Sequence, residues 1–165
     1  MDTMSEYDQD IEPHQELVNV YEGQLCSELT LTEQRSLVFH LLYALDAFDY
    51  DVSLNTIAAM YKANIGLEIP ENSYVFTAAH KVSTERHTID AAIVPLIENW
   101  RLDRIGLATK LILRLAIWEL MNSETDRAVV INEAVELAKD FGEKDSYKFI
   151  NGILDQYVKK DPTAE

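Results

Sequence analysis

Few residues in this chain have types and spacing suited to acid–base, nucleophilic or metal chemistry. Glu133 and Glu136 form a carboxylate pair at i,i+3 in an expected helix. They lie near its start, where carboxylates more often complement the helix dipole than transfer protons. Cys26 is the single cysteine and has no basic neighbour in sequence that would favour a thiolate. The histidines share no metal-ligand spacing; they are His14, His40, His80 and His87. The sequence therefore indicates neither an enzyme nor a metal or cofactor site.

The most informative stretch, residues 129–158, contains two helix patterns separated by a glycine. Apolar residues recur at three- and four-residue steps in both halves, which predicts one buried side on each helix. Gly142 stands where a left-handed C-terminal cap is expected, because glycine takes positive φ without a steric penalty. Asp145 or Ser146 is expected to cap the second helix through its side chain. That helix is expected to bury Phe149, Ile150, Ile153, Leu154 and Tyr157.

Two strings in this stretch resemble a known family. INEAVELAKDFG at residues 131–142, followed by DSYKFINGILD at residues 145–155, closely resembles the C-terminal motif of the NusB transcription antitermination family. LATKLILRLAIWEL at residues 107–120 is similar to the family's preceding helix. The match is dense from about Asn99 to Val158, weaker over residues 30–97, and absent before residue 30.

The resemblance implies an all-α, NusB-like fold of two small packed helical bundles. We expect subdomains of about residues 30–98 and 99–160, with a short tail at 161–165. It also implies a transcription antitermination factor that binds boxA-type RNA together with ribosomal protein NusE. Such a factor helps to load NusE onto RNA polymerase in the antitermination complex during ribosomal RNA transcription. It would act as a scaffold and composite RNA reader, with no catalytic step.

Family position also implies which residues bind RNA: Arg35, Tyr43, Phe141, Lys144, Lys148 and Asn151. The two aromatic rings are suited to stacking on bases, and the three cations to contacting phosphates. Other interpretations stay open. Phe141 is equally compatible with a hydrophobic contact at a helix end, Tyr43 with a core-edge aromatic, and Asn151 with a backbone hydrogen bond. Arg35, on its spacing alone, is compatible with a solvated surface charge.

Charge argues against simple RNA binding, because phosphate affinity usually comes from an excess of lysine and arginine. The net charge is -15. It is concentrated at the front, since residues 1–34 contain nine acidic residues and no basic one. In the family, the first helix opens with a cluster of arginines. Here only Arg35 remains, while Leu31, Thr32 and Glu33 occupy the neighbouring positions. An alternative function is therefore a NusB-derived protein-interaction module that has lost autonomous RNA binding.

Residues 1–29 are predicted to be an acidic N-terminal extension. Leu17, Tyr21 and Leu25 have the spacing of one short amphipathic helix. The segment is interpreted either as an extra docked helix or frayed tail, or as an acidic strap that competes with RNA. We expect its deletion to leave the fold intact and to strengthen RNA binding, because it carries eight negative charges and no positive one.

The remaining pattern predicts further helices and no strand. Thr30 begins a capping box with Glu33, and Ser53 and Ser73 are expected to cap later helices. Pro95 should interrupt a helix, because proline lacks an N–H donor. The chain has no apolar run of eighteen residues and no secretory signal. A cytoplasmic protein is the simplest interpretation. The helical domain of an RNA cytosine methyltransferase is disfavoured, because no nucleotide-binding α/β pattern follows.

Overall fold

The computed structural model describes residues 20–161, which form seven α-helices and no β-strand beyond one isolated bridge. The predicted all-α class is therefore confirmed for this part of the chain. The helices are α1 (Leu31–Ala47), α2 (Leu54–Ile65), α3 (Tyr74–Thr84), α4 (Arg86–Ile93), α5 (Leu107–Asn122), α6 (Arg127–Phe141) and α7 (Ser146–Lys160). None of them is long and apolar enough to cross a membrane.

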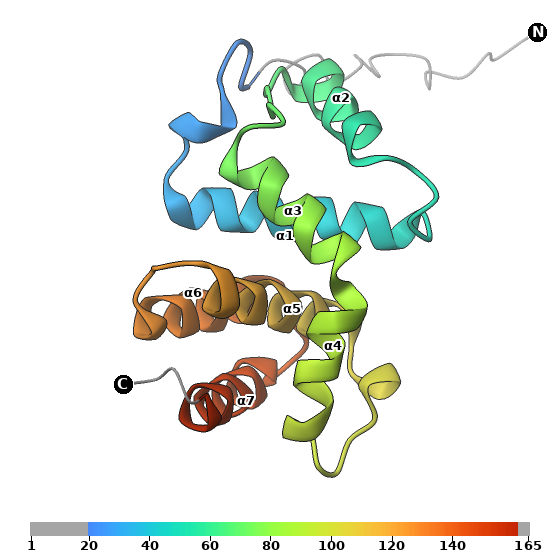
Figure 1. The fold of residues 1–165 in the computed structure, drawn as a ribbon. Helices are drawn as coiled ribbons and strands as arrows, with labels where there is room; N and C mark the ends of the chain where they lie inside the picture. Colours follow the sequence, from blue (N-terminus) through green and yellow to red (C-terminus); the bar gives the residue numbers. More distant parts are fainter. Residues whose placement is uncertain (1–19, 162–165) are drawn as a thin grey trace, which may run out of the picture.

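Helix α5 forms the centre of the molecule. It packs against α1, α3, α4, α6 and α7. Figure 1 shows it beside α6, below α1–α3 and above α7. All residues from Leu111 to Leu120 are buried, as expected for a helix that is apolar on most sides. Arg114 lies in this run. It makes the ion pair that its burial requires, donating to Asp90 of α4 at 2.7 and 2.8 Å.

The helix starts follow the predicted caps. Thr30 accepts a hydrogen bond from the Glu33 N–H, and Glu33 accepts one from the Thr30 N–H at 2.8 Å, which completes the capping box. The Ser53 and Ser73 hydroxyls cap α2 and α3 by accepting from the N–H three residues further on, without a reciprocal bond. Pro95 also acts as predicted, because α4 ends at Ile93 and a 3₁₀ turn, Val94–Leu96, follows.

Residues 20–29 do not form the predicted helix. They make a turn and a short 3₁₀ helix, Cys26–Glu28. Backbone hydrogen bonds join this segment to the end of α2 and the loop after it, including Cys26 N–H to Glu68 O at 2.9 Å. Cys26 is fully buried. Part of the expected extension therefore belongs to the packed domain, whereas residues 1–19 lie outside the described residues. The expected division into subdomains near residue 98 stays a prediction, since α4 packs against both α3 and α5.

The corner between α6 and α7 is built differently from the prediction. Gly142 has φ −79°, so it is not a left-handed cap. It is needed for space instead, because a Cβ there would lie 2.3 Å from Ser146 Oγ and 2.6 Å from Ala138 O. Asp145 takes the left-handed conformation, with φ 62°, and its side chain makes no capping hydrogen bond. The sequence therefore predicted the corner correctly, but the predicted left-handed cap at Gly142 and the predicted side-chain cap at Asp145 are wrong.

Candidate nucleic-acid interface

Arg35 lies in the interior and is not free to meet a phosphate. Its Nε is 3.1 Å from both carboxylate oxygens of Glu119 on α5, and the two side chains are only 6% and 4% exposed. The Tyr74 hydroxyl donates a very short hydrogen bond to the same carboxylate. Burial raises the pKa of Tyr74, and the negative charge of Glu119 raises it further. The interpretation of Arg35 as a surface charge is therefore wrong, and its burial against Glu119 argues against the predicted phosphate contact.

Two other predicted residues belong to a row of aromatic rings across α1 and the end of α6. Phe141 is 39% exposed and stacks on Phe39, with centroids 5.3 Å apart and planes at 17°. It also meets His40 edge-on at 4.8 Å. Tyr43, 46% exposed, lies beside Phe39 at 6.2 Å. The row presents partly exposed π faces backed by buried Phe39, which is suitable for stacking on unpaired bases.

The lysines predicted to contact RNA lie at the α6–α7 corner. Lys148 Nζ is 5.8 Å from the ring centre of Tyr147, and Lys139 Nζ is 5.5 Å from the same ring. Lys144 is exposed and lines a cavity of about 270 Å³ beside the corner. Asn151 is exposed one turn into α7, three positions after Lys148 on the same helix.

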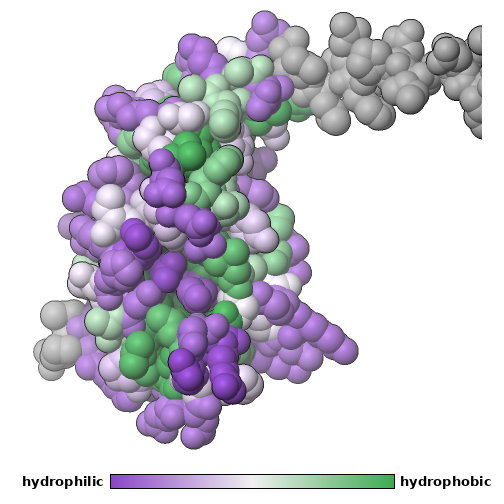
Figure 2. Space-filling view, turned by 90° about the vertical axis from the view of Figure 1, so that its right-hand side faces the viewer, coloured by the Kyte–Doolittle hydropathy of each residue, from purple (hydrophilic) through white to green (hydrophobic). Residues whose placement is uncertain are grey.

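Opposite the corner, the loop between α4 and α5 supplies residues that sequence reasoning had not assigned to the site. Trp100 is 61% exposed and packs edge-on against Phe149 at 6.5 Å. Arg104 and Phe149 line the same cavity as Trp100 and Lys144. Figure 2 shows hydrophobic surface bordering strongly hydrophilic surface in the lower half of its face, where this loop lies. Phe149 is half-buried rather than buried as predicted.

The polar groups of this cavity favour an anion at one point. Ser146 is buried, and its hydroxyl has no hydrogen-bond partner within the described residues. It stands at the first position of α7, where backbone N–H groups and the helix dipole attract negative charge. Two carboxylates also line the cavity. Glu143 is engaged by the Thr109 hydroxyl, and Asp145 is exposed and able to accept from a base amino group.

Ion pairing leaves positive charge available at this corner in spite of the acidic composition. Within residues 20–161, six cationic side chains have no carboxylate within the 4.0 Å of an ion pair: Arg86, Arg104, Lys110, Lys144, Lys148 and Lys160. Three of these six surround the α6–α7 corner: Arg104, Lys144 and Lys148. The corner therefore combines unpaired cations, exposed aromatic rings and a helix N-terminus.

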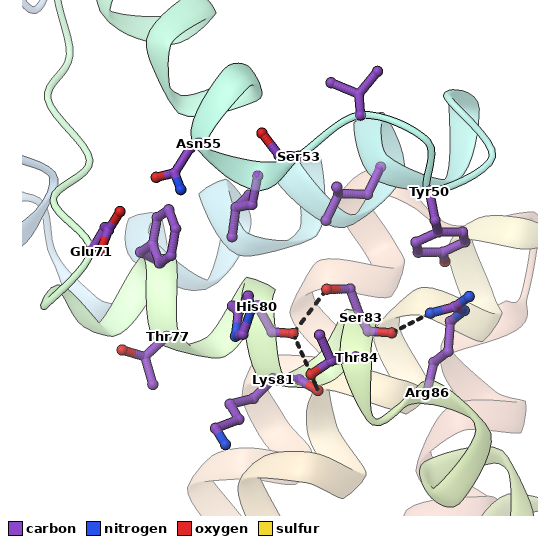
Figure 3. Close-up of a pocket in the computed structure, with 14 residues that line it drawn as sticks. Tyr50, Ser53, Asn55, Glu71, Thr77, His80, Lys81, Ser83, Thr84 and Arg86 are labelled. Carbon is purple, nitrogen blue, oxygen red and sulfur yellow. Dashed lines mark hydrogen bonds between the residues drawn. The ribbon is translucent and has the colours of Figure 1, made fainter.

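A larger cavity, of about 600 Å³, lies between α2 and α3 (Figure 3). Its cations are engaged within the protein: Arg86 lies over the Tyr50 ring at 3.9 Å, and Lys81 pairs with Glu85 at 3.9 Å. Of its aromatic rings, Phe76 is buried, Tyr50 is half-buried under Arg86, and only His80 is exposed. Size alone therefore does not make this cavity the better candidate for nucleic acid.

Comparison with known proteins identifies the relatives of this chain. The NusB family model matches residues 32–159. Two curated relatives are named transcription antitermination protein NusB. The one from Macrococcus caseolyticus is 31% identical over 133 residues, covering 79% of this chain and 98% of the relative. The one from Sulfurimonas denitrificans is 36% identical over 130 residues, covering 79% and 97%. The solved structure of T. maritima NusB superposes with a TM-score of 0.65 at 30% identity, covering 80% of this chain and 92% of that one.

Proposed function

The chain belongs to the NusB family, and we propose that it binds boxA-type RNA jointly with ribosomal protein NusE as a transcription antitermination factor. NusB proteins are non-enzymatic, RNA-binding antitermination factors. The proposed task is to help load NusE onto RNA polymerase during ribosomal RNA transcription, in the cytoplasm. The observation that carries the proposal is the cavity beside the α6–α7 corner, which brings exposed Trp100 together with Arg104 and Lys144, two cations without an ion-pair partner within residues 20–161.

The proposed mechanism uses two kinds of contact on single-stranded RNA. Splayed bases stack on Trp100, on Phe149 and on the rings around Phe141. Such stacking does not by itself distinguish one base from another. Arg104, Lys144 and Lys148 meet phosphates, and one phosphate lies at the N-terminus of α7 beside the Ser146 hydroxyl. NusE supplies the remaining positive charge, which compensates for the acidic chain. Arg35 has no part in this contact surface, whereas Tyr43, Phe141, Lys144, Lys148 and Asn151 stay in the proposed set.

One observation favours the alternative of a protein-interaction module without autonomous RNA binding. The single arginine at the start of α1 is buried against Glu119, and the neighbouring positions Leu31, Thr32 and Glu33 carry no positive charge. The surface of α1 near Arg35 therefore offers few cations to phosphates. The RNA-binding function requires the cations at the α6–α7 corner to compensate for this loss, whereas the interaction module does not.

A titration of fluorescent boxA-type RNA with and without NusE separates the two functions. We expect RNA binding that needs NusE and weakens as salt rises. Trp100→Ala should weaken it by about 1–3 kcal/mol, or roughly five- to 150-fold, through loss of one stacked base. Phe48→Ala is the matched control, because Phe48 is an exposed aromatic at the far end of α1, 44% exposed. Equal affinities for the two variants would contradict the proposed site. NusE binding without RNA binding under any condition would support the interaction module.

A further inference from the structure

Two side-chain contacts join α1 to α6 in a parallel register. Thr32 Oγ1 donates to Glu133 Oε1 at 3.1 Å. Two turns further along both helices, His40 meets Phe141. Both pairs are 101 positions apart in sequence. The two helices are therefore joined at one end by a polar contact and at the other end by the aromatic row.

A buried polar network lies between these two ends. Arg35 stands one turn after Thr32 on α1, and it bonds to Glu119, which in turn accepts from Tyr74. The network so joins α1 to α5 and α3. Glu133, on α6, reaches the same region through its second carboxylate oxygen. That oxygen, Oε2, is buried and has no hydrogen-bond partner within the described residues.

The unpartnered oxygen belongs to a residue that lines a small cavity between α1, α5 and α6. The cavity has a volume of about 10 Å³ and is lined by Arg35, Glu119 and Glu133 together with apolar side chains of α5 and α6. This volume is about the room that one water molecule needs, and a buried water normally finds two to four polar partners. A carboxylate oxygen left without any partner in such a place is costly.

We propose that one water molecule occupies this cavity and links the Glu133 carboxylate to the Arg35 guanidinium. The link makes Arg35 and Glu133 positioning residues that hold α1 and α6 in register, so that Phe39 and His40 meet Phe141 two turns away. It rests on the proposed function, because the aromatic row is part of the RNA-contacting surface. Arg35 therefore serves RNA binding from inside the protein, and touches no RNA itself.

Glu133→Gln tests this link, with Glu136→Gln as the matched control. Both variants remove one carboxylate from α6, but Glu136 is on the surface and pairs with Lys139. A pure charge effect would tighten RNA binding in both, because each loses a negative charge near the phosphates. Positioning predicts the opposite sign for Glu133→Gln: RNA affinity should fall roughly three- to tenfold, while Glu136→Gln stays unchanged or binds slightly tighter.

Two readouts that need no RNA accompany the titration. In the wild type, NMR should show magnetisation transfer between a long-lived water and the Ala134 and Leu137 side chains, which line the cavity. The Phe141 ring signals should move in Glu133→Gln and keep their positions in Glu136→Gln. If Glu133→Gln does not fold, Thr32→Val takes its place and should move the same ring signals by a smaller amount.

The outcomes separate the two proposals. Absence of the bound water, unmoved Phe141 signals in Glu133→Gln, or RNA binding at least as tight as in Glu136→Gln would overturn the positioning link. If the wild type binds no RNA with or without NusE, the proposed function fails instead. The water and the ring signals then decide alone whether the link exists.

Discussion

Replacing Lys144 and Lys148 with glutamine tests the electrostatic part of the proposed interface. Together with Arg104 they are the unpaired cations around the α6–α7 corner. Each phosphate contact to single-stranded RNA contributes about 0.7 to the slope of log affinity against log salt concentration. Three contacts therefore contribute about −2.1 to the slope, and Arg104 alone would contribute about −0.7. Whatever NusE adds, the slope of the variant should be shallower than that of the wild type by about 1.4, so the fall in affinity between about 50 and 200 mM salt should be about sevenfold smaller.

The assay is fluorescence anisotropy of labelled single-stranded RNA in the presence of NusE, at four salt concentrations. Lys62→Gln/Lys159→Gln is the control, since it removes two lysines that are paired on the surface, with Glu68 and Asp155. The control should keep the wild-type slope, because its two lysines lie outside the proposed interface. The contribution of NusE to the slope is the same for the wild type, the Lys144/Lys148 variant and the control. If the Lys144/Lys148 variant and the control have the same slope, these lysines do not contact phosphates.

Four further predictions concern stability and the N-terminal segment. Arg35→Met should lower the free energy of unfolding in urea by about 3–5 kcal/mol, because it leaves the buried Glu119 carboxylate without its cation. Adding Glu119→Leu should recover much of this loss. A loss smaller than that caused by replacing a surface lysine would contradict the buried pair. Gly142→Ala should destabilise by about 1–3 kcal/mol through its clash with Ser146 and Ala138, whereas Gly152→Ala, with open space around the added methyl, should stabilise α7 by up to about 1 kcal/mol; thermal melts that rank the two the other way would refute this. Tyr74 has a raised pKa in the folded protein, so its contribution to stability is complete below the ordinary value of 10.0 and is lost as pH rises above it; the stability gap between wild type and Tyr74→Phe should therefore narrow above that pH, and a constant gap would argue against a neutral buried phenol. Deletion of residues 1–19, which carry six acidic residues and no basic one, should strengthen RNA binding in the same titration; weaker or equal binding would exclude competition by this segment.

Local features of the fold were predictable because their causes lie within a few residues. Thr30, Ser53 and Ser73 cap helices through bonds to residues three positions away. The role of Pro95 follows from its own ring. The position of α5 in the core follows from its composition. In each case the signal and the structure it specifies occupy the same short segment.

The site was predictable only in part, because its decisive contacts join distant segments. Arg35 and Glu119 are 84 positions apart, so nothing near Arg35 in sequence indicates that it is buried. Trp100 and Arg104 lie between α4 and α5, and only folding brings them opposite Lys144. In sequence, Trp100 continues the apolar spacing of Ile93 and Ile97, so its position indicates a buried residue rather than an exposed one. Gly142 shows the same limit, since the need for glycine comes from Ser146 across a corner rather than from its own φ.

The most direct test of the central claim is to map the RNA on this protein by NMR. Isotope-labelled protein bound to unlabelled NusE would be titrated with boxA-type RNA. We expect the Trp100 indole N–H and the backbone amides of Lys144 to Lys148 to shift most, with smaller changes at Phe141 and Tyr43. Shifts concentrated around Phe76, His80 and Arg86, in the cavity between α2 and α3, would contradict the proposed site. No shift at any RNA concentration would contradict RNA binding itself.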